Sequence, residues 1–266
     1  FLSRSPQGSG GEQYGETHKC YFVMAMSAVR IFEWPGEVSF FDADPRREMS
    51  PVAYWRVLQN AAAGHAAALA AATEDLRRGG QTWMLSRMKL EVDRALMLGE
   101  KFTVETWPST RIKGARAYRD YALKDATGKV CARASSLWVI VDLATRRPVR
   151  IPDAIAALSV DPGYDTPALS DVLPAPEGGE AVEFRACWSD ADQNEHANNA
   201  AMLRWAVDAL PLPFLEQRRL SAVEVHYLAE VAIGDCVRVV SQGEAEVRQE
   251  IRRGETPVAR LLSRWS

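Results

Sequence analysis

Residues 188–210, WSDADQNEHANNAAMLRWAVDAL, repeat the pattern of residues 40–62, FFDADPRREMSPVAYWRVLQNAA, at an offset of 148 residues. Six positions are identical in the two stretches, namely 42–44, 53, 56 and 61 of the first. Further on, residues 99–104 align with residues 234–239 after a shorter loop. Matches that keep the same order indicate a duplicated module.

Each copy predicts one long helix followed by antiparallel strands. In the first half we expect a strand at 37–41, a helix at 50–75, and strands at 82–92, 101–107, 115–124 and 130–141. In the second half we expect a strand at 182–188, a helix at 197–210, and strands at 221–231, 235–242, 244–251 and 256–264. Ser50 suits the N-cap of the first helix and Pro51 its first turn.

These patterns predict an α+β fold of two modules, each an antiparallel sheet wrapped around a long helix. The expected limits are 36–150 and 182–266, with a linker at 151–181 that is rich in Pro, Asp and Gly. Residues 1–35, which are polar at 3–16, are interpreted as a leader, with secretion the less favoured reading of the apolar run at 20–26.

Composition excludes several classes of protein. Hydrophobic residues make up 47% of the chain and the net charge is −3, from 32 Lys+Arg and 35 Asp+Glu, which argues against wholesale disorder and against a dedicated nucleic-acid binder. No run of about 18 apolar residues predicts a membrane span. The four cysteines lie far apart, so we expect no metal site, reduced thiols and a cytoplasmic location.

The two copies differ in the polar residues at the start of the helix. The second copy has Gln193, Asn194 and His196 where the first has Pro45, Arg46 and Glu48, and it has Glu230 where the first has Ala95. A loop before a helix faces free backbone N–H groups and the positive end of the helix dipole, where a carbonyl could become an oxyanion. A facing carboxylate could activate water as a general base.

Plainer readings of the same residues stay open. Asp and Asn before a helix are commonly caps, and a single exposed His is commonly only solvated. For Glu230, at an apolar strand position, a simple ion pair competes with a catalytic task.

The chain resembles the acyl-acyl carrier protein (acyl-ACP) thioesterases of plant plastids and bacteria. The resemblance rests on Trp188-Ser189-Asp190-x-Asp192-x-Asn194-x-His196-x-Asn198-Asn199 and on Tyr227-Leu228-Ala229-Glu230. Weaker matches in the right order lie at 49–51, 60–66, 82–88 and 133–139, so that the likeness covers about residues 36–265.

This resemblance implies two tandem hotdog domains and hydrolysis of fatty acyl-ACP thioesters without metal or cofactor. By position it assigns the catalytic set to Asp192, Asn194, His196 and Glu230. Asn194 and His196 would bind the thioester, Glu230 would activate water and Asp192 would orient a neighbour. Many plant members have Cys after the catalytic Glu, where this chain has Val231, so we expect no thiol nucleophile there.

The resemblance also places the fatty tail in the N-terminal hotdog. The helical stripe that contains Ala61 and Gly64, together with Trp83, is the expected tail-binding site, with close packing of helix on sheet as the alternative. His65 is expected to be a buried structural residue. His226, at an even spacing from Glu230 on the same expected strand, is expected to be at most a supporting group.

The implied partner is an acyl carrier protein, with no nucleic acid partner. Five Arg-Arg pairs are either solvated or part of a patch that steers an acidic carrier. An acyl-coenzyme A thioesterase, a non-catalytic acyl-binding protein and a hotdog dehydratase remain alternatives. Whether the chain forms a homodimer is left open, because two fused modules already supply the usual hotdog pairing.

Overall fold

The computed structural model describes residues 30–193 and 195–266 of the chain. The first half contains β1 (Phe32–Glu37), α2 (Pro51–Ala68), α3 (Thr73–Arg77), β2 (Gln81–Val92), β3 (Lys101–Lys113), β4 (Arg116–Asp125), β5 (Val130–Asp142), β6 (Pro148–Val149) and α4 (Asp153–Ala156). The second half contains β7 (Glu180–Arg185), the 3-10 turn η1 (Trp188–Asp190), α5 (Asn199–Asp208), α6 (Leu212–Gln217), β8 (Leu220–Tyr227), β9 (Cys236–Gly243), β10 (Glu246–Arg253) and β11 (Thr256–Trp265).

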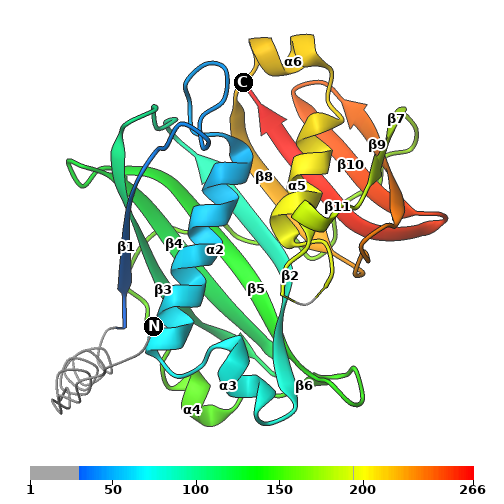
Figure 1. Cartoon of the computed structure of the whole chain (residues 1–266). Coiled ribbons are helices and arrows are strands. Elements are labelled where there is room, and N and C mark those ends of the chain that lie inside the picture. Colours follow the sequence, from blue (N-terminus) through cyan, green and yellow to red (C-terminus); the bar gives the residue numbers. More distant parts are fainter. Residues whose placement is uncertain (1–29, 194) are drawn as a thin grey trace, which may run out of the picture.

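The strands of the described residues form a single sheet in the order β1-β3-β4-β5-β2-β8-β11-β10-β9-β7, with β6 paired to β5. All its strand pairs are antiparallel, and the two halves join where β2 pairs with β8, in a register that sets Lys89 opposite Glu224. The sheet curves around α2 in one half and α5 in the other (Figure 1). The α+β fold with two helix-wrapping modules is therefore confirmed.

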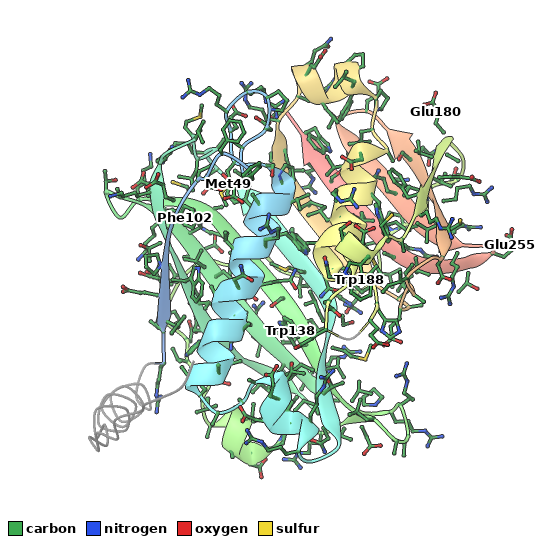
Figure 2. The ribbon with its side chains drawn as sticks, viewed as in Figure 1. Met49, Phe102, Trp138, Glu180, Trp188 and Glu255 are labelled. Atoms are coloured by element: carbon green, nitrogen blue, oxygen red, sulfur yellow. The ribbon has the colours of Figure 1, made fainter. Side chains whose placement is uncertain are left out.

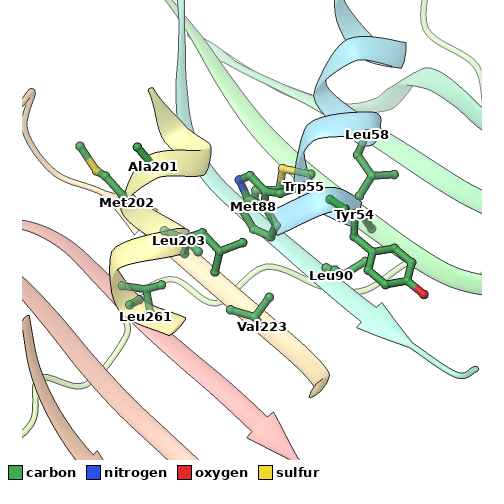
Figure 3. Packing of buried hydrophobic residues seen from close by; sticks show 14 of the residues in the cluster. Tyr54, Trp55, Leu58, Met88, Leu90, Ala201, Met202, Leu203, Val223 and Leu261 are labelled. Atoms are coloured by element: carbon green, nitrogen blue, oxygen red, sulfur yellow. The ribbon is translucent and has the colours of Figure 1, made fainter. Parts of the chain in front are cut away.

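One hydrophobic core spans both halves. It contains Trp55 of α2, Met88 of β2, Leu203 of α5 and Val223 of β8, each at most 2% exposed. These side chains approach one another between the two helices and the shared strands (Figure 3). The Trp55 indole donates to the Tyr227 hydroxyl at 3.0 Å, so that a polar contact also joins the halves.

The duplication extends to individual backbone hydrogen bonds. In the first half Ser50 N donates to Asp42 O and Met49 N to Leu96 O, and 148 residues later Asn198 N donates to Asp190 O. The partner of Ala197 N is Val231 O, although the connection to that strand is shorter in the second half. The second half therefore repeats the loop geometry of the first with different side chains.

The helix expected at 50–75 is interrupted. Ser50 caps its start as predicted, accepting a hydrogen bond from Ala53 N at 3.2 Å, but α2 ends at Ala68. Ala70 takes a left-handed conformation, with φ 51°, and Ala71 N donates back to Ala66 O. This is a Schellman-type helix end, whose left-handed position is usually a glycine. Because the residue here is an alanine, the sequence gives no signal that the helix ends at this point.

Two expected strands have different limits. Phe40 and Phe41, expected in a strand at 37–41, are 76% and 90% exposed, because β1 ends at Glu37 and the Asp42 carboxylate accepts from Ser39 N in a turn. The strand expected at 221–231 ends at Tyr227. Leu228 N and Ala229 N both donate to Val258 O, which ends the regular ladder. Glu230 therefore lies in a loop, and it does not share a strand face with His226.

The Pro-rich connection at 151–181 packs on the sheet. Ser170 N and its hydroxyl both donate to the Glu224 carboxylate on β8, and Arg87 of β2 donates to Ser170 O at 2.6 Å. Leu173 is 1% exposed. The domain limits drawn at 36–150, 151–181 and 182–266 stay a prediction, and most of the expected leader lies outside the described residues.

Candidate active site

The loop between η1 and α5 is anchored by Asp190. Its buried carboxylate accepts from Cys187 N at 2.8 Å and from the Arg204 guanidinium at 2.5 Å. Its carbonyl oxygen accepts from the Asn198 side chain at 2.7 Å. Asn198 also caps α5 through Ala201 N, which confirms the capping reading for this residue. The loop is thus fixed at both ends.

His196 and Glu230 come together from two different loops. The His196 Nε2 atom lies 3.7 Å from Glu230 Oε2, and the two side chains are 36% and 39% exposed. Backbone pairing of His196 with Ala232, and the hydrogen bond from Ala197 N to Val231 O, hold the two loops against each other. This geometry brings an imidazole and a carboxylate to one solvent-accessible point.

The other two members of the predicted set lie in the same loop by sequence. Asp192 is exposed, and its backbone N–H donates to His196 O at 3.0 Å, which closes a tight turn before the histidine. Asn194 lies outside the described residues. The roles assigned to Asp192 and Asn194 stay predictions.

A residue of the first half also reaches this site. The Arg146 guanidinium, from the turn between β5 and β6, donates to Glu230 Oε2 at 2.8 Å. Sequence reading grouped Arg146 with four other Arg-Arg pairs and had no signal to separate it from them. Its partner lies 84 residues away in the sequence, and the two come together because the halves pack against each other, with β2 paired to β8.

A cavity of about 690 Å³ begins at the loop before α5 and runs along α2. At the loop end it is lined by Asp192, Asn198 and Asn199. Its walls farther on are mainly apolar side chains of α2, β2, β5 and α4, namely Ala62, Ala63, Ala66, Ala67, Trp83, Trp138, Ile155 and Leu158. The cavity therefore joins the polar loop to a largely apolar space along α2.

Of the three predicted tail-binding residues, Trp83 lines this cavity, and Ala61 and Gly64 do not. Trp83 lines it, and its indole donates to Ala71 O at 2.9 Å. Ala61 is buried in the core and is not among the lining residues. At Gly64 an added Cβ would lie 3.0 Å from Trp34 and 3.3 Å from Phe32, so this face of α2 packs against β1. Close packing of helix on sheet accounts for the glycine.

Arg119 brings a charge into the cavity wall. Its guanidinium contacts Nδ1 of His65 at 3.0 Å and donates to the Thr106 hydroxyl at 3.2 Å. Burial holds the pKa of Arg119 below its ordinary value. His65 itself is fully buried, as predicted, and stacks on Phe32 with ring centroids 5.3 Å apart.

His226 pairs with Glu224 and makes no hydrogen bond to the described members of the reactive site. Its Nε2 atom lies 2.9 Å from the Glu224 carboxylate, which Ser170 also contacts. Burial alone would raise the pKa of Glu224, but the hydrogen bonds from His226 and Ser170 outweigh it and hold that pKa below its usual range. His226 thus belongs to the contact between β8 and the connecting segment at 151–181.

An exposed tryptophan lies near the site. Trp188, the first residue of η1, is 84% exposed and lies at the surface beside the start of α5 (Figure 2). Within the described ranges, no group of three or more His, Cys, Asp or Glu side chains has the arrangement of a metal site. In the same part of the chain, no helix has the length and apolarity to cross a membrane.

Sequence comparison connects this arrangement to a known family. The family model described as "Acyl-ACP thioesterase N-terminal domain" matches residues 31–159, and the one described as "Acyl-ACP thioesterase C-terminal domain" matches residues 175–259. A chloroplastic palmitoyl-acyl carrier protein thioesterase of Gossypium hirsutum is 31% identical over 60% of this chain and 40% of its own length. A chloroplastic dodecanoyl-[acyl-carrier-protein] hydrolase of Cinnamomum camphora is 24% identical over 81% of this chain and 61% of its own.

Solved structures show the same fold. An acyl-ACP thioesterase from Bacteroides thetaiotaomicron superposes with a TM-score of 0.82 at 24% identity, covering 89% of this chain and 98% of that one. The 12:0-ACP thioesterase from Umbellularia californica also gives 0.82, at 21% identity, over 90% and 98% of the two chains.

The two family matches follow one another along the chain in the order of the two structural halves, and together they take in most of it. The match with this chain spans about 40% of the length of the Gossypium hirsutum relative. It belongs to the acyl-ACP thioesterase family.

Proposed function

We propose that the protein hydrolyses thioesters between a fatty acyl chain and an acyl carrier protein, releasing the free fatty acid. The observation that carries the proposal is the pair His196 and Glu230, 3.7 Å apart, with His196 in the loop whose Asp192 lines the polar end of a 690 Å³ cavity. Membership of the acyl-ACP thioesterase family supports the choice of reaction and of carrier.

In the proposed reaction the Glu230 carboxylate removes a proton from a water molecule as the water oxygen bonds to the thioester carbonyl carbon. The C=O electron pair moves to oxygen, and the resulting oxyanion is stabilised by hydrogen-bond donors of the loop before α5. When the C=O bond re-forms, the C–S bond breaks, and the carrier thiolate takes the proton that Glu230 received. Water and thioester give one carboxylic acid and one thiol.

His196 and Asn194 are proposed to bind and polarise the thioester carbonyl. Asp192 is proposed to orient a neighbouring group. The fixed ends of the loop support these assignments, because a donor set held by Asp190 and Asn198 needs little rearrangement as charge develops.

The cavity is the proposed place of the acyl chain. Each methylene that leaves water for an apolar wall contributes about 0.8 kcal/mol to binding, so a cavity whose walls are mainly alanine and tryptophan favours long alkyl chains over polar substrates. Trp83 and the Ala66 face of α2 are proposed as its wall.

The direct experiment is a hydrolysis assay with acyl carrier protein and coenzyme A thioesters of several chain lengths. Faster turnover of the carrier thioesters supports the proposal. Preference for coenzyme A thioesters would favour the coenzyme A alternative, and binding without hydrolysis would favour an acyl-binding protein. A cytoplasmic location and a homodimer stay predictions, and the named plant relatives are chloroplastic.

A further inference from the structure

We propose that Arg146 is a positioning residue of this site, through which the first half of the chain orients the general base carried by the second half. Its guanidinium would hold one oxygen of the Glu230 carboxylate and leave the other oxygen to take the proton from water. The inference rests on the proposed function.

Glu230 needs an external support. It lies in the loop after β8, outside the sheet ladder, and its carboxylate is 39% exposed. His196 lies at 3.7 Å, beyond hydrogen-bond reach. In residues 30–193 and 195–266, the side-chain hydrogen bond to this carboxylate comes from Arg146, at 2.8 Å.

Only one of the two Glu230 carboxylate oxygens is approached by the described side chains. Arg146 and His196 both approach Oε2 of Glu230. Its Oε1 atom has no hydrogen-bond partner among the described side chains and backbone groups. A cation on one oxygen fixes the plane of the carboxylate and leaves the second oxygen available to water.

The backbone of Arg146 is held in a tight turn. The turn is fixed by the Asp142 carboxylate, which accepts from the Thr145 backbone at 2.7 Å and from its hydroxyl at 2.8 Å, and by Arg146 N, which donates to Asp142 O. Within this turn Arg146 has φ 57°, a left-handed conformation in which glycine or asparagine is usual. An arginine is therefore placed where the backbone favours a residue with no Cβ.

The remaining charged groups around Glu230 act on its backbone. Arg253 of β10 donates to the Glu230 carbonyl oxygen at 3.2 Å and to the Asp235 carboxylate at 2.9 Å. The Asp235 carboxylate in turn accepts from Ala232 N at 3.0 Å. Arg253 thus fixes the loop, whereas Arg146 fixes the carboxylate.

The left-handed turn offers an unusually clean variant. Arg146→Gly removes the guanidinium while relieving the backbone, so the melting temperature should stay the same or rise. We expect kcat on an acyl-ACP thioester to fall by about tenfold with KM changed less than twofold, because a misplaced base affects the chemical step. Arg147→Ala, which removes the neighbouring exposed arginine of the same turn, is the matched control and should behave as wild type.

Two further measurements separate positioning from other roles. Arg146→Lys keeps a donor and should recover part of the lost kcat. In a Glu230→Gln background, adding Arg146→Gly should cause no further loss, since there is no base left to orient.

Each of three results would overturn the inference while wild-type hydrolysis leaves the proposed function standing. The first is a kcat of Arg146→Gly equal to that of Arg147→Ala. The second is a rise in the KM of Arg146→Gly with kcat unchanged, which would indicate that Arg146 docks the carrier. The third is an additive loss of kcat in the double variant. Wild-type protein that hydrolyses no acyl thioester would instead remove the proposed function itself.

Discussion

At the scale of a single residue, Val231 leaves the position directly after Glu230 without a thiol. It is fully buried, directly after Glu230, and its carbonyl oxygen accepts from Ala197 N. Cys131 is also buried, and burial raises the pKa of its thiol, which keeps it protonated and unreactive. Cys187 and Cys236 are exposed.

The first prediction is that a variant with all four cysteines changed to serine or alanine keeps the wild-type turnover. Cys131→Ser is the preferred change at the buried position, because a hydroxyl retains a polar partner for Arg94, which lies 3.1 Å from the sulfur. The measurement is kcat on an acyl-ACP thioester, with the melting temperature as the control for folding. Trapping an acyl group on a cysteine by mass spectrometry would contradict the expectation.

Single residues also mark where sequence reading succeeded and where it stopped. Glu230 and His196 were singled out because the repeat showed Ala95 and Glu48 at the same places in the other copy. The structure brings the pair together. Arg146 was missed because a contact between a hairpin of one half and a loop of the other leaves no local pattern.

At the scale of elements, α2 presents two different faces. One carries Gly64 and packs against Trp34 of β1, and another carries Ala63, Ala66 and Ala67 and lines the cavity. Sequence reading predicted the helix and its cap, but several small-residue stripes run along it. Which stripe faces the cavity depends on where β1 and β2 pack.

The second prediction follows from this arrangement. Ala66→Leu should fill room for about three methylenes, which at about 0.8 kcal/mol each corresponds to about 2.4 kcal/mol, or roughly 50-fold, against long acyl chains. Short acyl chains should be much less affected. The measurement is the ratio of kcat/KM values on long-chain and short-chain acyl-ACP thioesters.

The control for this helix is Ala68→Leu, the same change at a position of α2 that is not among the cavity-lining residues. Both variants should melt close to wild type for the comparison to hold. If Ala66→Leu leaves the chain-length ratio where Ala68→Leu does, the acyl chain lies elsewhere.

At the scale of the whole molecule, the two halves meet where β2 pairs with β8, and this seam contains a buried carboxylate. Glu224 of β8 lies opposite Lys89 of β2, is 3% exposed, and accepts from Ser170 of the connecting segment and contacts His226. Neither half alone supplies all of these partners. The repeat analysis predicted two modules, but not that one sheet would run through both, because strand pairing between modules has no signature in the repeat.

The third prediction is acid lability at this seam. The pKa of Glu224 is held below its usual range, where burial is outweighed by hydrogen bonds, so its ionised form stabilises the fold at pH values above about 4.3. That contribution is lost as the pH falls through the lowered folded-state pKa. Melting temperatures should therefore drop steeply below about pH 4.3.

Glu224→Gln tests the source of this dependence. It should lower the melting temperature at neutral pH and flatten its decline in acid, whereas Glu255→Gln, at an exposed turn position, should leave the wild-type curve unchanged. The informative range is about pH 5 to about pH 3, roughly one unit either side of the usual glutamate pKa. If the melting temperature of Glu224→Gln falls in parallel with that of the wild type over this range, the acid lability belongs to other groups.

The central claim, that the carboxylate beside His196 activates water, is tested most directly by Glu230→Gln. This change keeps the size of a side chain that is 39% exposed and replaces the carboxylate by an amide that cannot act as a base, so the melting temperature should change little, since the ion pair with Arg146 lies at the surface. Turnover of an acyl-ACP thioester should fall by about 100-fold or more relative to wild type and to the Glu255→Gln control. A Glu230→Gln enzyme that retains more than about half of the wild-type kcat would contradict the account.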